Sequence, residues 1–331
     1  MEEKIKISIP KSTLDLLKKD CEDFKVLKES GAPNMNAFIN TLVVNYYEEF
    51  SASEERLCDE IKGALFPLPE AYKGETLDKI LRVLYKRGEY DAPKGVSASL
   101  SFKPTKASEK SVLYIENVLL KNESISSFYR RLLISYSKKT KNEREKIIYK
   151  DVLSDLERAV AKGNRVCIIL KNKTVLNDAA IFGVASSRDE LFNYVLFYDG
   201  KNNGTMRLAT VGSVSILPSK SKIPEENQEM FKRQIECGAQ YPIYPSDSEP
   251  IKVQLSERGK KLFQKIYLYR PVPVKIEGDI YTFNCSKNQA LYYFERFGDS
   301  ALILSPKKLG IEMRNYHYYA LKKYRTLYNK D

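Results

Sequence analysis

The chain begins with a short strand pattern that has no partner near it in the sequence. Residues 4–10, KIKISIP, alternate polar and apolar side chains and end on proline, and a helical pattern follows at once. A strand of this length is not stable unless another strand pairs with it and one of its faces is covered. No second strand lies within hairpin range, so the partner must come from a distant segment or from another subunit.

The same pattern recurs later in the chain. Residues 124–137, SISSFYRRLLISYS, match residues 34–47, NMNAFINTLVVNYY, at a shift of ninety positions. The matched positions are Phe38 with Phe128, Leu42 with Leu132, and Tyr46 with Tyr136. Before the second stretch, SLSFKP at 99–104 repeats the alternating strand and its closing proline. Two isolated strands, each leading into two helices, resemble the ribbon-helix-helix fold, in which both strands form one antiparallel ribbon.

We therefore expect Lys4–Ile9 to pair with Ser97–Phe102 inside one chain. The alternative, that the second pattern is coincidental and the first strand pairs with its copy in another subunit, stays open at this point. In both cases the isoleucines of the first strand face the helices and the polar residues face outward, because side chains alternate along a strand. The outward residues of the expected ribbon are Lys4, Lys6, Ser8, Ser99 and Ser101.

The distribution of charge bears on the partner of the protein. The net charge of +12 favours an anionic partner such as a nucleic acid. In ribbon-helix-helix proteins the outward ribbon residues read the DNA major groove. Residues 1–60, however, hold eight Lys/Arg against thirteen Asp/Glu, a net of −5, whereas residues 121–150 hold nine against three, a net of +6. We expect most of the attraction for phosphate to lie beyond the first sixty residues.

Composition argues against an enzyme. The sequence has a single histidine, His317, five scattered cysteines without a CxxC pair, and no phosphate-binding or nucleophile-elbow motif. We therefore expect no catalytic residues, no metal and no cofactor. The cysteine usage and the absence of a long apolar run predict a cytoplasmic protein without a membrane span.

The middle of the chain predicts a small β-barrel. A helix over 143–162 is followed by short strands at 165–171, 179–186, 192–199, 205–211 and 214–217, a spacing typical of Sm-like or SH3-like barrels. Residues 193–214, NYVLFYDGKNNGTMRLATVGSV, resemble the core of a WYL domain. Tyr194, Val195 and Arg207 occupy the positions of its Tyr, Leu and first Arg. Asn193 replaces the Trp, and Ala209 and Thr210 replace an Asp-Arg pair.

This barrel carries the candidate nucleic-acid site. Arginine grips phosphate in a bidentate manner and an aromatic ring can stack on an unpaired base. The candidate residues are Tyr194, Arg207, Arg165, Arg188, Lys171 and Lys173. For Tyr194 the alternative is a core position whose hydroxyl has a buried partner.

The last part, residues 250–331, reads as a βαββαβ layer of the ferredoxin-like type. It resembles the extension that follows WYL domains, which implies dimerisation. The expected organisation is a ribbon-helix-helix unit (1–50), a helical connector (51–92), a second such unit (93–142), the WYL barrel (143–220), a linker (221–249) and the C-terminal extension (250–331).

In domain order the chain resembles the WYL-domain accessory proteins of type VI-D CRISPR systems. The resemblance implies a homodimer that binds single-stranded RNA and stimulates an RNA-guided, RNA-cutting effector nuclease. The alternative is a DNA-binding transcriptional regulator, in which the ribbon reads an operator and the WYL domain senses a ligand.

Overall fold

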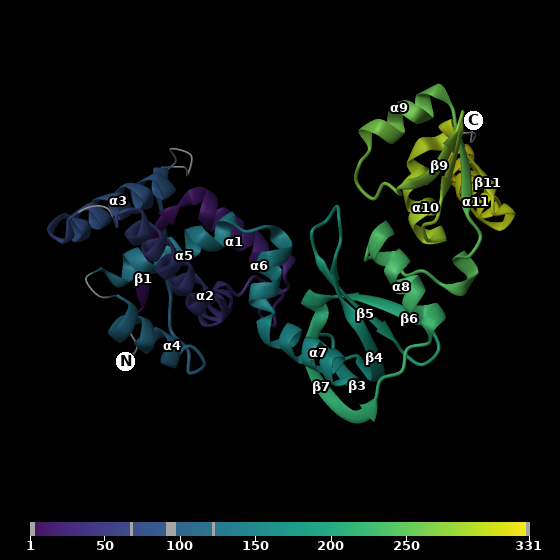
Figure 1. The fold of residues 1–331 in the computed structure, drawn as a ribbon. Helices are drawn as coiled ribbons and strands as arrows, with labels where there is room; N and C mark the ends of the chain where they lie inside the picture. Colours follow the sequence, from purple (N-terminus) through teal and green to yellow (C-terminus); the bar gives the residue numbers. More distant parts are fainter. Residues whose placement is uncertain (1–3, 67–68, 91–96, 121–122, 329–331) are drawn as a thin grey trace. The chain divides into compact units, whose positions relative to one another are not determined.

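The computed structural model describes residues 4–66, 69–90, 97–120 and 123–328 (Figure 1). Contacts divide the chain into two units, Met1–Lys150 and Asp151–Asp331, and each is described by itself. No helix among the described residues is both long enough and apolar enough to cross a bilayer.

The first unit contains the predicted ribbon. Strands β1 (Ile5–Pro10) and β2 (Ser97–Phe102) pair antiparallel, with Ile7 opposite Leu100 and Ser8 opposite Ser99. The predicted pairing within one chain is therefore confirmed. The alternation is confirmed as well: Ile7, Ile9, Leu100 and Phe102 are buried, whereas Lys4, Lys6, Ser8, Ser99 and Ser101 are exposed.

Helices follow each strand. After β1 come α1 (Lys11–Asp23), α2 (Met35–Ala64) and α3 (Glu70–Tyr90). After β2 come α4 (Glu109–Tyr114), a π-helical turn (Ile115–Leu119), α5 (Ile125–Lys138) and α6 (Lys141–Ile148). Asn34 and Ser124 cap α2 and α5, each accepting a hydrogen bond from the amide three residues on. The two caps are separated by the same ninety positions as the repeat.

The repeated positions meet in the core of this unit. All six matched residues, from Phe38 to Tyr136, are buried. The ring of Tyr136 lies edge-on to the rings of Phe38 and Tyr46, with centroids 6.3 Å apart in both pairs. The matched apolar positions are thus the surfaces through which the two halves pack on one another.

Two predicted domain boundaries fall inside helices. The boundary at residue 50 lies within α2, and the one at residue 142 lies within α6, which packs on α2. The helix predicted over 143–162 is divided, because the backbone leaves helical geometry at Tyr149 (φ −107°, ψ 28°). Tyr149 is buried and its hydroxyl donates to the carbonyl of Phe24, so the end of α6 belongs to the first unit.

The second unit begins with α7 (Lys150–Lys162) and a five-stranded antiparallel sheet. The strands are β3 (Asn164–Leu170), β4 (Val175–Ser186), β5 (Asn193–Tyr198), β6 (Asn203–Arg207) and β7 (Val211–Lys220). Their order is β6-β5-β4-β3-β7. The strand predicted at 205–211 ends early, because a 3-10 turn (Leu208–Thr210) separates β6 from β7.

Helix α8 (Glu225–Cys237) follows and stacks Phe231 on Phe182 of β4, with ring centroids 4.9 Å apart. A 3-10 turn (Pro245–Asp247) leads into the C-terminal layer. Its elements are β8 (Ile251–Leu255), α9 (Glu257–Lys265), β9 (Pro273–Glu277), β10 (Ile280–Phe283), α10 (Lys287–Phe294), a 3-10 segment (Glu295–Ser300), β11 (Ala301–Ser305) and α11 (Lys307–Tyr328).

The predicted βαββαβ order is confirmed. The four strands form one antiparallel sheet in the order β11-β8-β10-β9, so β10 lies between two strands that are joined by α9. This is the split β-α-β arrangement of ferredoxin-like layers. The alternating Ile251, Val253 and Leu255 of β8 are buried against α10 and the start of α11.

Candidate nucleic-acid interface

Arg207 stands at the end of β6, directly opposite Tyr194 of β5. Its guanidinium carbon lies 3.5 Å from the centroid of the Phe192 ring. A guanidinium stacked on an aromatic face is held in one plane and gains cation–π attraction. Both side chains are half-buried, so the stack is fixed by its surroundings and still reaches solvent.

Tyr194 itself does not provide a stacking surface. It is only 8% exposed, and its hydroxyl donates to Glu190 Oε2 at 2.7 Å. This burial matches the alternative interpretation of Tyr194 as a core residue. The accessible aromatic ring beside Arg207 belongs instead to Phe192, which the sequence analysis did not select.

The turn between β3 and β4 carries the two predicted lysines. Lys171 and Lys173 are exposed, and Lys173 has a positive φ of 66°. The Lys171 amide donates to the Thr210 carbonyl at 2.9 Å, and the Thr210 hydroxyl donates to the Arg207 carbonyl at 2.6 Å. The turn is therefore tied to the segment that follows Arg207, and these three cations belong to one region of the five-stranded sheet.

Arg188 joins this region and Arg165 does not. Arg188 is exposed on the β4–β5 loop (residues 187–192), the loop that also carries Phe192. Arg165 lies at the other end of β3 from Lys171, about 20 Å away along an extended strand. Its guanidinium is bound to the Asp178 carboxylate (Nε–Oδ1 2.8 Å) and to the Asp178 carbonyl. The structure therefore pairs Arg165 with Asp178 at the opposite end of β3 and does not bring it together with Lys171.

The C-terminal layer contributes residues that the sequence analysis missed. Tyr269 donates from its amide to Asp189 Oδ2 at 2.9 Å and from its hydroxyl to Glu190 Oε1 at 2.7 Å. The hydrogen bond to the Glu190 carboxylate is the main cause that raises the pKa of Tyr269 to about 12. The exposed Arg296 lies over the Tyr269 ring at 5.5 Å and adds a cation beside the β4–β5 loop.

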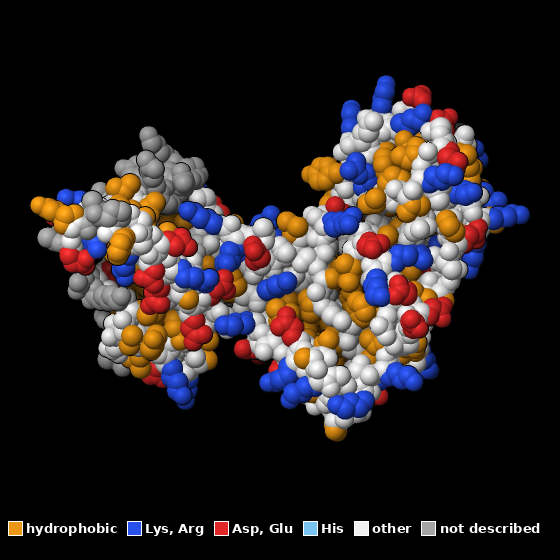
Figure 2. All heavy atoms as spheres, in the orientation of Figure 1, with side chains coloured by type: hydrophobic (Ala, Val, Ile, Leu, Met, Phe, Trp, Pro, Cys, Tyr) orange, Lys and Arg blue, Asp and Glu red, His pale blue; other side chains and the backbone are white. Residues whose placement is uncertain are grey.

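The ribbon of the first unit is a second, separate candidate surface. Its five outward residues are exposed, and Arg130 of α5 donates from Nε to the Ser8 carbonyl at 2.6 Å. On the face drawn in Figure 2, Lys and Arg side chains occur over both units and are interspersed with Asp and Glu. Positive charge on that face is therefore not gathered into a single patch.

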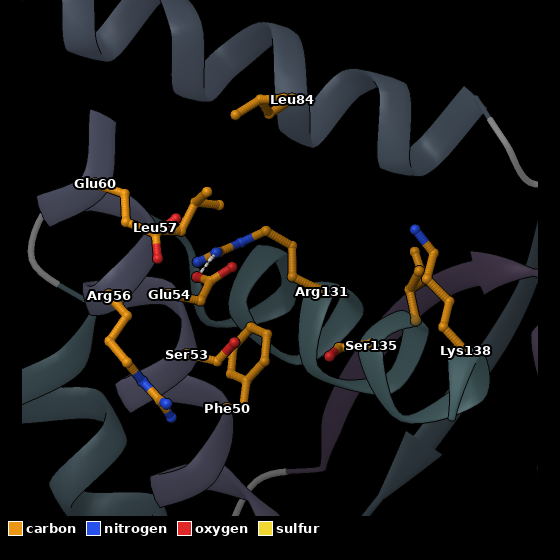
Figure 3. Close-up of a pocket in the computed structure, with 11 residues that line it drawn as sticks. Phe50, Ser53, Glu54, Arg56, Leu57, Glu60, Leu84, Arg131, Ser135 and Lys138 are labelled. Atoms are coloured by element: carbon orange, nitrogen blue, oxygen red, sulfur yellow. Dashed lines mark hydrogen bonds and ion pairs between the residues drawn. The ribbon is translucent and has the colours of Figure 1, made fainter. Parts of the chain in front are cut away.

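The first unit also has a hollow of about 640 Å³ between α2, α3 and α5 (Figure 3). Phe50, Leu57, Leu84 and Ile134 give it apolar walls. Arg131 lies over the Phe50 ring and forms ion pairs with Glu54 and Glu123. The charge of Arg131 is therefore compensated within the hollow, whose lining also includes Arg56, Glu60 and Lys138.

Comparison with known proteins shows the fold. No protein-family model and no curated protein matches the chain. The crystal structure of a CRISPR Cas-related protein matches 99% of this chain and 95% of that chain, with a TM-score of 0.63 at 16% identity. Proteasome accessory factor B/C (PafBC) of Arthrobacter aurescens gives a TM-score of 0.23 at 13% identity, over 69% of this chain and 40% of that one. The first match shows that this chain shares the fold of a CRISPR Cas-related protein over nearly its whole length.

Proposed function

We propose that this chain is a non-enzymatic, cytoplasmic accessory protein that binds single-stranded RNA through its barrel and stimulates an RNA-guided, RNA-targeting CRISPR effector of type VI-D. The observation that carries the proposal is the Arg207–Phe192 stack, with Lys171, Lys173 and Arg188 around it. The shared fold with a protein described as CRISPR Cas-related supports the setting. The WYL resemblance of residues 193–214 supports the choice of the barrel.

The chemistry of this surface suits an unpaired strand. A guanidinium can hold one phosphate through two parallel hydrogen bonds. An aromatic ring at the same place can contact a base, and such stacking is worth about 1–3 kcal/mol per base. Lysines on a neighbouring turn can follow the phosphate backbone as point charges. None of these contacts needs a base-pair edge, so duplex grooves are not required.

The fold assignments belong to this proposal. We assign the five-stranded sheet, with its 3-10 turn between β6 and β7, to the Sm/SH3-like barrel of a WYL domain. We assign the β1–β2 ribbon and its helices to two tandem ribbon-helix-helix halves.

We also propose a homodimer formed through the C-terminal layer. Leu309 and Met313 of α11 are buried, and the same face of the helix continues as exposed Tyr316, Tyr324 and Leu327. An apolar face that runs on beyond its own domain is suited to a second copy of the chain. A dimer would hold two RNA sites on one particle and raise avidity.

The alternative function is a DNA-binding regulator. The observation in its favour is the exposed outer face of the ribbon, with Lys4 and Lys6 on one side and Ser99 and Ser101 on the other strand. In this case the ribbon would read an operator and the barrel would sense a ligand.

The two functions are separated by fluorescence anisotropy with labelled single-stranded RNA and duplex DNA at several salt concentrations. We expect RNA binding that weakens with salt and falls about tenfold or more in Arg207→Ala. Lys6→Ala should bind RNA like wild type. Arg158→Ala, which removes an exposed arginine paired with Asp155 on α7, is the matched control. Preference for duplex DNA that is lost in Lys6→Ala would establish the regulator instead.

A further inference from the structure

The β4–β5 loop connects the proposed RNA site to the C-terminal layer. Its last residue, Phe192, carries the Arg207 guanidinium. Two positions earlier, Glu190 is bound from both sides. One carboxylate oxygen accepts the Tyr194 hydroxyl from β5 and the other accepts the Tyr269 hydroxyl from the C-terminal layer, both at 2.7 Å. One side chain thus links the strand opposite Arg207 to a segment more than seventy residues away in sequence.

The neighbouring contacts make the link rigid. Asp189 accepts the Tyr269 amide at 2.9 Å, so Tyr269 is held through both its backbone and its side chain. The loop closes on itself through the Ser187 amide, which donates to the Phe192 carbonyl at 2.8 Å. The hydrogen bonds that Asp189 and Glu190 accept from Tyr269 leave the loop little freedom to move independently of that residue.

The backbone indicates that these contacts impose the conformation. Leu191 and Tyr269 have positive φ angles of 56° and 66°. Residues other than glycine, asparagine and aspartate rarely adopt the left-handed backbone region. They remain there only where contacts with the surrounding structure hold them in it. Leu191 directly follows Glu190, and Tyr269 is its partner in the Glu190–Tyr269 contact.

We propose that Glu190 is a positioning residue, through which Tyr269 of the C-terminal layer sets the orientation of Phe192 and therefore of the Arg207 guanidinium. The proposal rests on the proposed function in one respect, that Arg207 contacts RNA. It goes further in making the RNA affinity of the barrel depend on the C-terminal layer. A partner that displaces Tyr269 would change RNA affinity without touching the RNA.

Two substitutions at Glu190 separate positioning from charge. Glu190→Ala and Glu190→Gln both remove one negative charge near the site, and by charge alone both should bind RNA more tightly. Glutamine can still bond both tyrosines, since its carbonyl accepts from one hydroxyl and its amide donates to the other. We expect Glu190→Gln to bind at least as tightly as wild type. Glu190→Ala loses the hydrogen bonds from both Tyr194 and Tyr269 and should bind at least about three- to tenfold more weakly, the range for the loss of one such bond.

Tyr269→Phe removes only the hydroxyl of the link, with Tyr267→Phe, 71% exposed and close by, as control. We expect Tyr269→Phe to weaken RNA binding by a similar factor and Tyr267→Phe to have no effect. Combined with Arg207→Ala, Tyr269→Phe should add nothing, because its effect acts through Arg207. Equal affinities of Glu190→Ala and Glu190→Gln, or an additive double variant, would overturn the proposal.

Hydrogen exchange gives a readout that does not depend on RNA. In Tyr269→Phe the amides of residues 187–192 should exchange faster than in wild type or Tyr267→Phe, beginning with Ser187. Unchanged exchange overturns the positioning role even if RNA binds elsewhere. If Arg207→Ala and the loop variants all bind RNA like wild type, while Tyr269→Phe shows faster exchange, the RNA site is rejected and the link between Tyr269 and the loop is retained.

Discussion

Replacing Arg144 with methionine should destabilise the first unit severely. Arg144 of α6 holds Asp20 of α1 in a bidentate pair, with Nε–Oδ2 at 2.6 Å and Nη2–Oδ1 at 3.0 Å. Asp20 is 1% exposed, and its other partner is the Tyr136 hydroxyl of α5 at 3.2 Å. Arg144 also donates to the Lys139 carbonyl at 2.6 Å. The cluster therefore joins the half that follows β1 to the half that follows β2.

The magnitude follows from the burial. Methionine keeps much of the side-chain volume but leaves the Asp20 carboxylate in the interior with one hydrogen bond from Tyr136. Breaking a buried pair on one side costs about 3–5 kcal/mol, a large part of the 5–15 kcal/mol that usually stabilises a domain. With a urea m-value of about 2 kcal/mol per molar, the unfolding midpoint should fall by roughly 1.5–2.5 M.

Urea unfolding followed by circular dichroism and tyrosine fluorescence measures this shift, since the sequence has no tryptophan. The double variant Asp20→Leu/Arg144→Met should recover most of the loss, because it removes both charges. Lys62→Met, which breaks an exposed pair with Asp59, should change the free energy of unfolding by no more than about 0.5 kcal/mol. A shift below about 0.5 M in Arg144→Met, or a double variant no better than the single one, would refute the reasoning.

Three further results are expected. Leu100→Ala, on the buried face of the ribbon, should lower the free energy of unfolding by about 2–4 kcal/mol in urea titrations, whereas Lys6→Ala on the outer face should leave it within about 0.5 kcal/mol. Burial raises the pKa of Cys21 to about 11, so at neutral pH a maleimide should label the partly exposed Cys58 long before Cys21, as mass spectrometry would show. Because the pKa of Tyr269 in the folded state is raised from 10 to about 12, the unfolded state ionises first; melting temperatures should fall between pH 10 and 12, and fall less in Tyr269→Phe.

The parts of the fold that could be predicted from the sequence leave a local or periodic trace. Alternation, a closing proline and a shift of ninety positions favoured the β1–β2 pairing over pairing with another subunit, and strand and helix patterns predicted the βαββαβ order. The site was only partly predictable for the same reason. A pattern places Arg165 and Lys171 at strand ends, but the two ends of β3 look alike in a single sequence.

The contribution of the C-terminal layer left no such trace. Tyr269 contacts the β4–β5 loop, and Arg296 lies over the Tyr269 ring, through tertiary packing that no periodic pattern in the sequence indicates. The burial of Tyr194 was one of two open interpretations. The sequence pattern placed Tyr194 and Phe192 on the same face of the strand. Which of the two rings lies beside Arg207 depends on the conformation of the loop that contains Glu190.

The register of the ribbon bears on the choice between the two functions. A ribbon built from two identical subunits presents the same residues from both strands, and its operator is correspondingly palindromic. Here Lys6 lies opposite Ser101 and Ser8 opposite Ser99, so the two strands present different residues. A single asymmetric face of this kind is unsuited to a half-site that is itself palindromic. A regulator built on one such ribbon would prefer a non-palindromic half-site, which the proposed homodimer would repeat as an inverted pair. A selection from random duplexes that returned half-sites each palindromic in itself would contradict this reasoning. We expect the selection to enrich no duplex sequence and RNA binding to depend on Arg207, which would favour the RNA-binding function over the regulator.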